Sequence, residues 1–220
     1  MSFDMLKDYL FYQDDWATIY CGDCLEIMPL MEPESVDLVL TDPPYGLGMR
    51  TVSGGTLRNT QTKFMDEMNK NQWDNAIPSQ KCFDEIFRIS KNQIIFGYNY
   101  FYLPPSRGIV VWDKMTFIPT MSRVEIIWTS LDFPAELIVF NSNQHDREHP
   151  TQKPFELVKK LIQKVIGEGM ILDPFLGSGT TCVAAKNLNR KSIGIEINPK
   201  YCEIAVKRLR QEVFDFRKEI

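Results

Sequence analysis

The sequence predicts an α/β protein with a doubly wound, mostly parallel sheet and helices on both faces. Short runs of branched and aromatic residues, bounded by turn residues, recur along the chain as expected of buried strands. Segments with the 3,4 apolar spacing of helices lie between them. Such alternation favours parallel strands joined by helical crossovers. The length of 220 residues predicts a single domain over residues 1–220.

The expected elements follow each other from the amino end. The strands are Thr18–Cys21, Val36–Thr41, Gln93–Phe96, Gly108–Trp112, Glu125–Thr129, Met170–Asp173 and Ser192–Glu196. The helices are Pro78–Ser90, Phe155–Ile166, Ser178–Leu188 and Pro199–Glu212. Each strand is a short branched or aromatic run that ends at turn residues, and Phe155–Ile166 shows the helical apolar spacing well.

The composition is that of an ordinary globular protein, with 44% apolar and 25% charged residues. The formal net charge of −4 lacks the basic excess that usually marks a nucleic-acid-binding protein. Any contact with a polyanion therefore has to be local. The acidic and aromatic segment Met1–Trp16 differs from a secretory or transit peptide, and no apolar stretch has the length of a membrane span.

Five cysteines are an odd set for a disulfide framework, so a reducing, cytoplasmic compartment is expected. Cys21 and Cys24 form a Cys-x-x-Cys, which could indicate zinc or redox chemistry. No second pair or nearby histidine supports that interpretation, so we expect no metal site. The histidines, His145 and His149, are expected to be structural or solvent-facing.

One segment differs from the rest of the chain. Gly46–Trp73 is polar, rich in glycine, threonine and asparagine, and lacks a sustained apolar period. Structureless loops of this length are usually functional or disordered, so we expect a long, mobile loop over residues 46–73. It is also the obvious local basic element, since it carries Arg50, Arg58, Lys63 and Lys70. A tolerated surface insertion is the alternative interpretation.

A first corner follows the expected strand Val36–Thr41. It consists of Asp42, Pro43, Pro44 and Tyr45. Both prolines lack a backbone N–H, so neither can continue a strand ladder or start an ordinary helical turn. A buried strand therefore ends on a rigid corner that carries a carboxylate and an aromatic ring.

A second corner lies between the strand Met170–Asp173 and the helix Ser178–Leu188. Gly177 and Gly179 let the backbone approach a ligand closely, and the helix N-terminus favours an anionic group. The corner lacks both the Gly-Lys-Ser/Thr ending of a phosphate-binding loop and the full Gly-x-Gly-x-x-Gly spacing. Glu196 ends the next strand, where an acid typically accepts from ribose hydroxyls. Together these features indicate an adenosyl cofactor without phosphates; a plain βαβ turn with a surface glutamate is the alternative.

Several segments resemble the amino-group DNA methyltransferases that use S-adenosylmethionine. Thr41–Gly46 (TDPPYG) is similar to their catalytic motif, and Asp173–Thr181 (DPFLGSGTT) to their cofactor loop. His149–Pro154 (HPTQKP) and Gly22–Glu26 (GDCLE) resemble further signatures of that family. The catalytic motif precedes the cofactor motif, as in the beta arrangement of these enzymes. The resemblance covers nearly the whole chain and implies a class I, Rossmann-like methyltransferase fold with permuted motif order.

The resemblance also implies roles for individual residues. The catalytic residues that hold the target base would be Asp42, Pro43, Pro44 and Tyr45. The residues that bind S-adenosylmethionine would be Asp23, Asp42, Thr151, Lys153, Asp173, Phe175, Gly177, Ser178, Gly179, Glu196 and Asn198. Among them, Asp23 would contact the adenine ring, and Thr151 and Lys153 would lie near the methionine end.

The chemistry implied is methyl transfer to a poorly nucleophilic amine, whose lone pair is delocalised into the ring of the base. Acceptors for the amine hydrogens, here the Asp42 carboxylate and the Pro43 carbonyl, would draw the nitrogen toward a tetrahedral shape. Direct transfer from the sulfonium then needs positioning more than covalent catalysis. The base has to leave the duplex, and Tyr45 offers it a stacking face.

Simpler roles for these residues stay open. Asp42 could cap a turn, and Tyr45 could be a buried packing residue. Asp173 could stabilise its turn instead of contacting a ligand. Lys153 could be solvated, as a lysine beside a loop often is.

The source of sequence selectivity is not evident. Related enzymes commonly insert a target-recognition region before the HPTQKP segment, whereas only residues 131–149 are available here. We therefore expect no separate target-recognition domain. Selectivity would fall to the loop over residues 46–73, to a second copy in a homodimer, or to a partner subunit. DNA phosphates could contact that loop or the tail cations Lys207, Arg208 and Arg210, for which a solvated helix face is expected.

The predicted function is site-specific methylation of adenine N6 in DNA, in the cytoplasm of a bacterial or phage-infected cell, as in restriction–modification. An acid at the position of Asp42 usually accompanies adenine methylation in the family that the chain resembles. Cytosine-N4 methylation is the alternative of the same class, and a non-catalytic DNA-binding or scaffold subunit is the alternative of another class. RNA or protein-amide methylation is less favoured, because enzymes with related motifs place the cofactor loop first.

Overall fold

The computed structural model describes residues 5–47, 76–115, 122–141, 153–165, 167 and 169–211. Its strands are β1 (Leu10–Gln13), β2 (Ala17–Cys21), β3 (Val36–Thr41), β4 (Ser90–Phe96), β5 (Ile109–Asp113), β6 (Val124–Thr129), β7 (Glu136–Val139), β8 (Ile171–Asp173) and β9 (Ser192–Glu196). They form a nine-stranded sheet in the order β1-β2-β9-β8-β3-β4-β6-β5-β7. Strands β2, β9, β8, β3 and β4 run parallel, whereas β1 and β6 run antiparallel to their neighbours. The predicted mostly parallel sheet is therefore confirmed.

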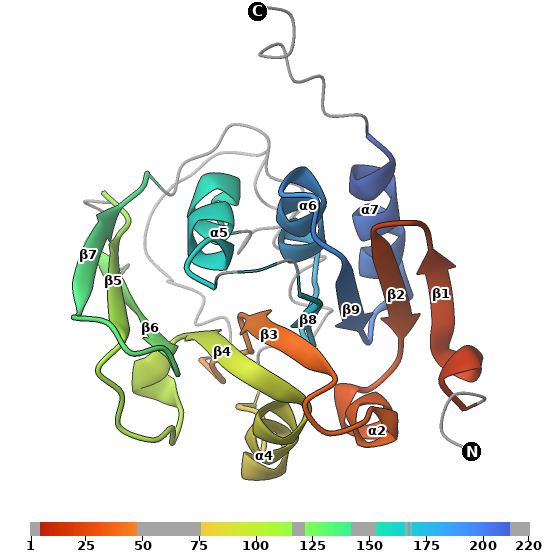
Figure 1. Cartoon of the computed structure of the whole chain (residues 1–220), viewed down its shortest axis with the longest axis horizontal. Coiled ribbons are helices and arrows are strands. Elements are labelled where there is room, and N and C mark those ends of the chain that lie inside the picture. The colour runs from red at the N-terminus through yellow and green to blue at the C-terminus, as the bar shows by residue number, and fades with distance from the viewer. Residues whose placement is uncertain are drawn as a thin grey trace, which may run out of the picture.

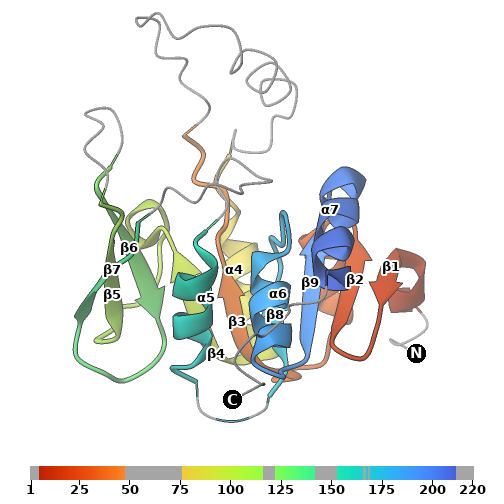
Figure 2. The same cartoon turned by 90° about the horizontal axis from the view of Figure 1, so that it is seen from above.

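Helices cover both faces of this sheet. The α-helices are α2 (Cys24–Ile27), α4 (Gln80–Ile89), α5 (Phe155–Ile162), α6 (Thr180–Asn187) and α7 (Pro199–Arg210), and the 3-10 turns are η1 (Lys7–Tyr9), η2 (Met28–Leu30) and η3 (Tyr98–Tyr100). Figure 1 shows α5, α6 and α7 on one face and α2 and α4 on the other, which confirms the doubly wound arrangement. In Figure 2 the first three helices lie side by side over their common face.

The expected strands are confirmed, with ends that differ by at most three residues. The sequence prediction missed β1 and β7, which are the two edge strands of the sheet. Their side chains are largely exposed, so neither carries the apolar run by which the buried strands were recognised. It also missed α2, whose four residues are too few to show a helical period.

Buried apolar side chains explain why the central strand reads as an unbroken apolar run. Leu38 and Leu40 of β3 pack in a cluster with α5 and α6. Val36 and Val39 pack in a second cluster with α4 and α2. A parallel strand buried on both faces has no reason to alternate between polar and apolar residues.

The parallel strands place the two predicted corners side by side. The carboxyl ends of β3 and β8 lie next to each other, because these strands pair in parallel. The helix after β8 covers one face of the sheet and the helix before β4 covers the other, as Figure 1 shows. Strands β8 and β3 therefore flank a topological switch point, where open α/β sheets bind ligands.

Some expectations concern residues outside the described ranges. The loop over residues 46–73 is described only at residues 46 and 47, and Thr151 and both histidines are also outside. The single domain, the mobile loop and the lack of a recognition domain therefore stay predictions. In the part of the chain that is described, no helix has the length and apolar character needed to span a membrane.

Candidate active site

Asp42, Tyr45 and Lys153 converge at the carboxyl end of β3. The Tyr45 hydroxyl donates to Asp42 Oδ1 at 2.5 Å, and Lys153 Nζ lies 2.6 Å from Asp42 Oδ2. Lys153 lies two residues before α5 in the chain, and its side chain is only 11% exposed. The alternative interpretation, in which Lys153 is solvated, is therefore wrong. Each of the two oxygens of Asp42 has a partner.

Glu125 on β6 is a site residue that the sequence analysis missed. Its side chain is 7% exposed, and its Oε1 lies 2.7 Å from the Tyr45 hydroxyl and 3.1 Å from Lys153 Nζ. Its Oε2 lies 2.8 Å from Lys114 Nζ. A glutamate inside the otherwise apolar run of β6 was the signal that could have revealed it. Asp42, Tyr45, Lys114, Glu125 and Lys153 are called the acid–lysine cluster below.

Electrostatics keep this cluster in a defined state of ionisation. Burial raises the pKa of Asp42, and the Glu125 charge adds to this effect while Lys153 opposes it. Burial would also raise the pKa of Glu125, but the charges of Lys153 and Lys114 outweigh it and lower that pKa to about 2. Burial and both carboxylates raise the pKa of Tyr45 well above its ordinary value. At neutral pH the phenol thus keeps its hydrogen and Glu125 is ionised.

Aromatic rings from the end of β4 surround Tyr45. Its ring stacks on Tyr100 with centroids 4.6 Å apart and an interplanar angle of 14°, and Phe101 lies 5.9 Å away. Gly97 has a φ of +78°, and a Cβ there would lie 2.3 Å from Tyr45 Cε1, so the position requires glycine. These partners were not predicted from the sequence, although the segment Gly97–Tyr102 (GYNYFY) is rich in aromatic residues.

Asp173 joins the two corners. It is buried and accepts hydrogen bonds from Thr41 Oγ1 at 2.8 Å, from Thr181 Oγ1 at 2.6 Å, and from the Phe175 N–H at 3.1 Å. Burial raises its pKa to about 6. The geometry favours the interpretation of Asp173 as the acid that stabilises its turn.

Glu196 holds the glycine corner from the neighbouring strand. Its Oε2 accepts from the Gly177 N–H and its Oε1 from the Asn198 N–H, both at 2.8 Å. Burial raises its pKa. A carboxylate has about four lone-pair sites and these backbone donors do not fill them, so Glu196 retains capacity for a ligand hydroxyl. Asn198 also caps α7, because its Oδ1 accepts from the Lys200 N–H at 3.0 Å.

Asp23 lies beside this corner through a backbone link. The Gly22 N–H donates to the Glu196 carbonyl at 3.0 Å. Asp23 Oδ1 accepts from the Leu25 N–H at 2.8 Å and so caps α2. The GDCLE segment therefore adjoins β9, and its acid caps α2 there. The contact of Asp23 with the adenine ring stays a prediction.

Helix α7 is fastened to the glycine corner by Arg208. Its Nη1 donates to the Ser178 carbonyl at 2.6 Å, to Ser178 Oγ at 3.0 Å and to Thr180 Oγ1 at 3.1 Å. A Cβ on Gly179, whose φ is +85°, would lie 2.7 Å from Ala205 Cβ, so this glycine permits close packing of the corner on α7. The expectation that the tail cations lie on a solvated helix face is therefore wrong for Arg208.

The remaining predicted residues lie close to these groups in the chain. Pro43 is buried, and Pro44 and Phe175 are half-buried. The Phe175 ring packs against the core on the α4 side of the sheet. All five cysteines are free thiols, and the described residues contain no group of three or more His, Cys, Asp or Glu side chains that could hold a metal ion.

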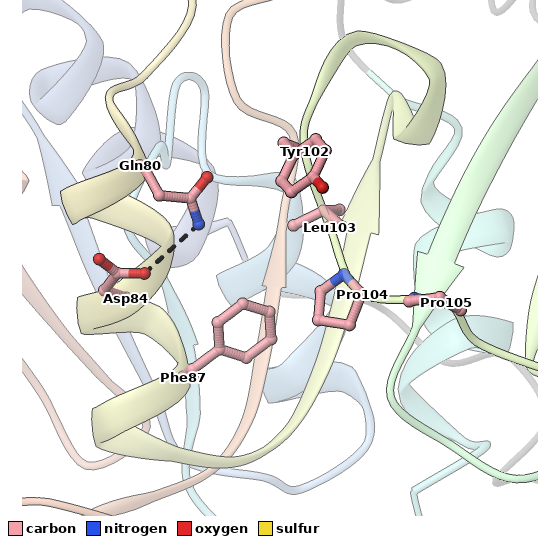
Figure 3. A pocket seen from close by; sticks show the side chains of 7 residues that line it. All are labelled: Gln80, Asp84, Phe87, Tyr102, Leu103, Pro104 and Pro105. Atoms are coloured by element: carbon pink, nitrogen blue, oxygen red, sulfur yellow. Dashed lines mark hydrogen bonds between the residues drawn. The ribbon is translucent and has the colours of Figure 1, made fainter.

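A separate pocket of about 310 Å³ lies outside the acid–lysine cluster. Figure 3 shows it between α4 and the segment that follows η3. It is lined by Gln80, Asp84, Phe87, Tyr102, Leu103, Pro104 and Pro105. None of the residues that the sequence predicted for the site lines this pocket.

The doubly wound sheet, with an acid corner and a glycine corner at its switch point, defines a Rossmann-like methyltransferase fold. PvuII DNA methyltransferase (cytosine-N4-specific) superposes with a TM-score of 0.66 and 19% identity, over 91% of this chain and 89% of that chain. The M1.HpyAVI–SAM complex superposes with a TM-score of 0.55 and 22% identity, over 89% of this chain and 100% of that chain. These likenesses confirm the predicted fold.

Sequence comparison then identifies the family. Residues 78–207, more than half of the chain, match the N6_N4_Mtase family model, described as DNA methylase, and the chain belongs to this family. The match begins after the Asp42–Tyr45 corner and so does not depend on it. The type II methyltransferase M.HpaI of Haemophilus parainfluenzae is 28% identical over 90% of this chain and 76% of its own length.

Family membership makes the chain a DNA methyltransferase of the N6-adenine or N4-cytosine type. It confirms that part of the predicted function, and at the level of the family it confirms S-adenosylmethionine as the cofactor. DNA is accordingly the substrate of the family.

Proposed function

We propose that this chain methylates the exocyclic N6 amine of adenine in DNA, with Asp42 as the acceptor for the amine hydrogens. The observation that supports this best is the position of Asp42 at the switch point, paired with Lys153 and Tyr45. The Thr41–Asp173 hydrogen bond ties that position to the glycine corner on β8. An amine acceptor thus stands beside a corner suited to the methyl donor.

The proline corner suits the activation of an aromatic amine. Asp42 supplies carboxylate oxygens, and Pro43 supplies a carbonyl on a chain stiffened by the proline ring. Burial raises the pKa of Asp42, and the Lys153 ammonium at 2.6 Å opposes this effect and so favours the ionised, accepting form of the carboxylate. Acceptors that are already oriented stabilise the charge that develops on the amine without reorganisation.

The base would stack on Tyr45, against which the aromatic rings that follow β4 pack. Stacking of a base on an aromatic ring contributes roughly 1–3 kcal/mol. One face of Tyr45 is already taken by Tyr100. An extruded base therefore stacks on the opposite face of Tyr45 or displaces Tyr100.

The glycine corner and its neighbours fit S-adenosylmethionine. Glu196 retains acceptor capacity for ribose hydroxyls, and Asp23, which follows Gly22 bonded to the Glu196 carbonyl, would serve the adenine end. A sulfonium cation suits surroundings that contain Asp42 and Asp173, whereas a phosphate does not. When bound, the cofactor supplies an electrophilic methyl group. Gly177, Ser178 and Gly179 would line it, with Lys153 near the methionine end.

Adenine is proposed over cytosine because Asp42 stands where the family usually carries an acid for adenine methylation. The M.HpaI relative is named a type II methyltransferase, so a role in restriction–modification is part of the proposal. A homodimer or partner subunit as the source of selectivity stays a prediction.

The test is to express the chain in cells without DNA methylation and to analyse their DNA by long-read sequencing and by mass spectrometry of nucleosides. We expect N6-methyladenine in a defined sequence context. N4-methylcytosine alone would refute the choice of adenine, and unmodified DNA, together with no labelled methyl transfer in vitro, would refute the activity.

Variants separate the assigned site from a general loss of structure. Asp42→Ala should abolish transfer, and activity that survives it would refute the role of Asp42. Asp84→Ala, which removes an exposed carboxylate from α4 at the separate pocket, is the matched control and should methylate like the parent.

A further inference from the structure

The acid–lysine cluster contains one hydroxyl hydrogen between two carboxylates. The Tyr45 oxygen lies 2.5 Å from Asp42 Oδ1 and 2.7 Å from Glu125 Oε1. A phenol donates one hydrogen bond, so it can serve only one of these oxygens at a time. Both distances are short enough for either choice.

Asp42 has no unengaged oxygen when that hydrogen points to it. Its Oδ1 then accepts from Tyr45, and its Oδ2 lies 2.6 Å from Lys153 Nζ. An incoming amine would have to compete with a charge-assisted hydrogen bond on either oxygen. Each oxygen can still accept a second hydrogen bond, but Asp42 becomes the stronger acceptor for the amine when one present partner turns elsewhere.

We propose that Glu125 is a positioning residue that receives the Tyr45 hydroxyl hydrogen when the target amine arrives, and so releases Asp42 Oδ1 for that amine. The proposal rests on the proposed function, in which Asp42 is the amine acceptor. The hydrogen stays covalently bound to the Tyr45 oxygen and only rotates. No heavy atom has to move, because both acceptors are already within hydrogen-bond distance.

Burial and two ion pairs hold the Glu125 carboxylate in place as an acceptor. Its side chain is 7% exposed, and Lys114 and Lys153 hold its two oxygens at 2.8 and 3.1 Å. Lys153 bridges Asp42 and Glu125, so it remains paired whichever carboxylate the phenol serves. The side chains of the two acceptors differ in exposure: Asp42 is 26% exposed at the corner, whereas Glu125 is enclosed within the sheet.

The key variant is Glu125→Gln. The amide oxygen is drawn to Lys114 at the Oε2 position, which leaves the NH₂ group at the Oε1 position to donate to the Tyr45 oxygen. Lys153 keeps Asp42 Oδ2 as its partner. The hydroxyl hydrogen is then held on Asp42. We expect the single-turnover rate of methyl transfer to fall about 10- to 30-fold, the loss of about one hydrogen bond to a charged group. The dissociation constants for DNA and S-adenosylmethionine are measured alongside to separate binding from chemistry.

A double-mutant cycle with Tyr45→Phe distinguishes this role from structural support. Phenylalanine keeps the ring but removes the hydrogen that Glu125 is proposed to receive. In the Tyr45→Phe background, Glu125→Gln should lower the rate by less than about threefold, which is a coupling between the two sites. Equal losses in both backgrounds would overturn the proposal.

Two further variants guard against a folding defect. Glu125→Asp keeps the charge for the lysines but withdraws the carboxylate from Tyr45, so it should show the same loss and the same dependence on Tyr45. Glu85→Gln is the matched control, because Glu85 is 18% exposed and ion-paired with Arg88 on α4, away from the cluster. It should transfer methyl groups at the parental rate.

A titration of Asp42 by carboxyl-selective NMR tests the switch without methyl transfer. Asp42 faces Lys153 before α5, Glu125 on β6 and the Tyr45 hydroxyl, and its charge also acts on Asp173 of β8. Lys114, after β5, pairs with Glu125. Glu125→Gln removes a like charge and fixes the phenol hydrogen on Asp42, so the pKa of Asp42 should fall below the parental value. An unchanged or higher pKa would overturn the switch. Failure of the parent to methylate DNA would instead refute the proposed function.

Discussion

The two corners at the switch point are held in place by different kinds of contact. The proline corner over residues 42–45 is surrounded by ionised side chains from β6 and from the segments after β5 and before α5. The glycine corner over residues 173–179 is held by backbone N–H groups and hydroxyls that donate to Asp173 and Glu196, and by Arg208, which donates to the corner's own backbone and hydroxyls. One corner therefore carries charges and hydrogens that can rearrange, and the other carries a fixed backbone frame.

This difference matches the demands of the two substrates of a methyltransferase. An amine that becomes more nucleophilic changes its charge distribution during the reaction, so its partners must respond to it. A cofactor is recognised by shape and by hydroxyl groups, for which a rigid frame costs less reorganisation. The Thr41–Asp173 hydrogen bond keeps the two corners in register.

Substitution of Asp42 should have the greatest consequence at the proline corner. Asp42→Ala removes both oxygens and should lower the rate of methyl transfer by roughly 10²–10⁴-fold. Asp42→Asn keeps one carbonyl oxygen as an acceptor and should lose less. Single-turnover assays with labelled methyl donor check the order, and equal losses for both variants would show that the charge, not the acceptor, is what matters.

Removal of Lys153 from the proline corner should lower the free energy of unfolding more than a substitution at the glycine corner does. Lys153→Met leaves Asp42 and Glu125 as buried like charges, and loss of one partner from a buried ionic group costs about 3–5 kcal/mol. Denaturant unfolding measures the free energy. A second substitution, Glu125→Gln, should restore part of the loss, and the absence of any restoration would contradict the assigned repulsion.

Gly97→Ala should displace Tyr45. The added Cβ would lie 2.3 Å from the Tyr45 ring on a backbone with φ of +78°, so we expect a loss of about 2–4 kcal/mol of unfolding free energy. Gly167→Ala is the matched control. Gly167 has a φ of +111° but nothing within 4 Å of a Cβ, so only the backbone strain should remain. Equal losses for the two variants would argue against the contact with Tyr45.

Asp173 provides a pH test of the glycine corner. Burial raises its folded pKa to about 6 from 3.8, so between these values the folded state binds more protons than the unfolded state. Its contribution to stability is therefore greatest at low pH and declines as the pH rises, by up to about 1.4 kcal/mol per unit. Asp173→Asn should remove this decline between pH 4 and pH 6. Parallel unfolding curves for variant and parent across that range would contradict the raised pKa.

The sequence predicted the fold well because buried parallel strands leave a strong apolar signal. The run Val36–Thr41 and the strand Ser192–Glu196 were predicted with the observed bounds. Both corners were also recognisable, since prolines and glycines at strand ends restrict or free the backbone in specific ways.

Partners from distant parts of the chain were not predictable from local patterns. Glu125 reaches the site because the antiparallel strand β6 lies beside β4, and strand order is a tertiary property. Tyr100 and Gly97 matter because the Tyr45 ring packs on them. Arg208 looked like an ordinary surface cation on a basic helix end, and only the packing of α7 on the glycine corner shows its contacts.

The contacts of Arg208 have a kinetic consequence. The guanidinium holds the Ser178 carbonyl, its hydroxyl and the Thr180 hydroxyl at once, so the glycine corner cannot open unless α7 releases it. We expect this latch to set how fast a ligand enters and leaves the corner more than how tightly it is held. The residence time of the methyl donor would then depend on Arg208, a residue far in sequence from Asp42 at the proline corner.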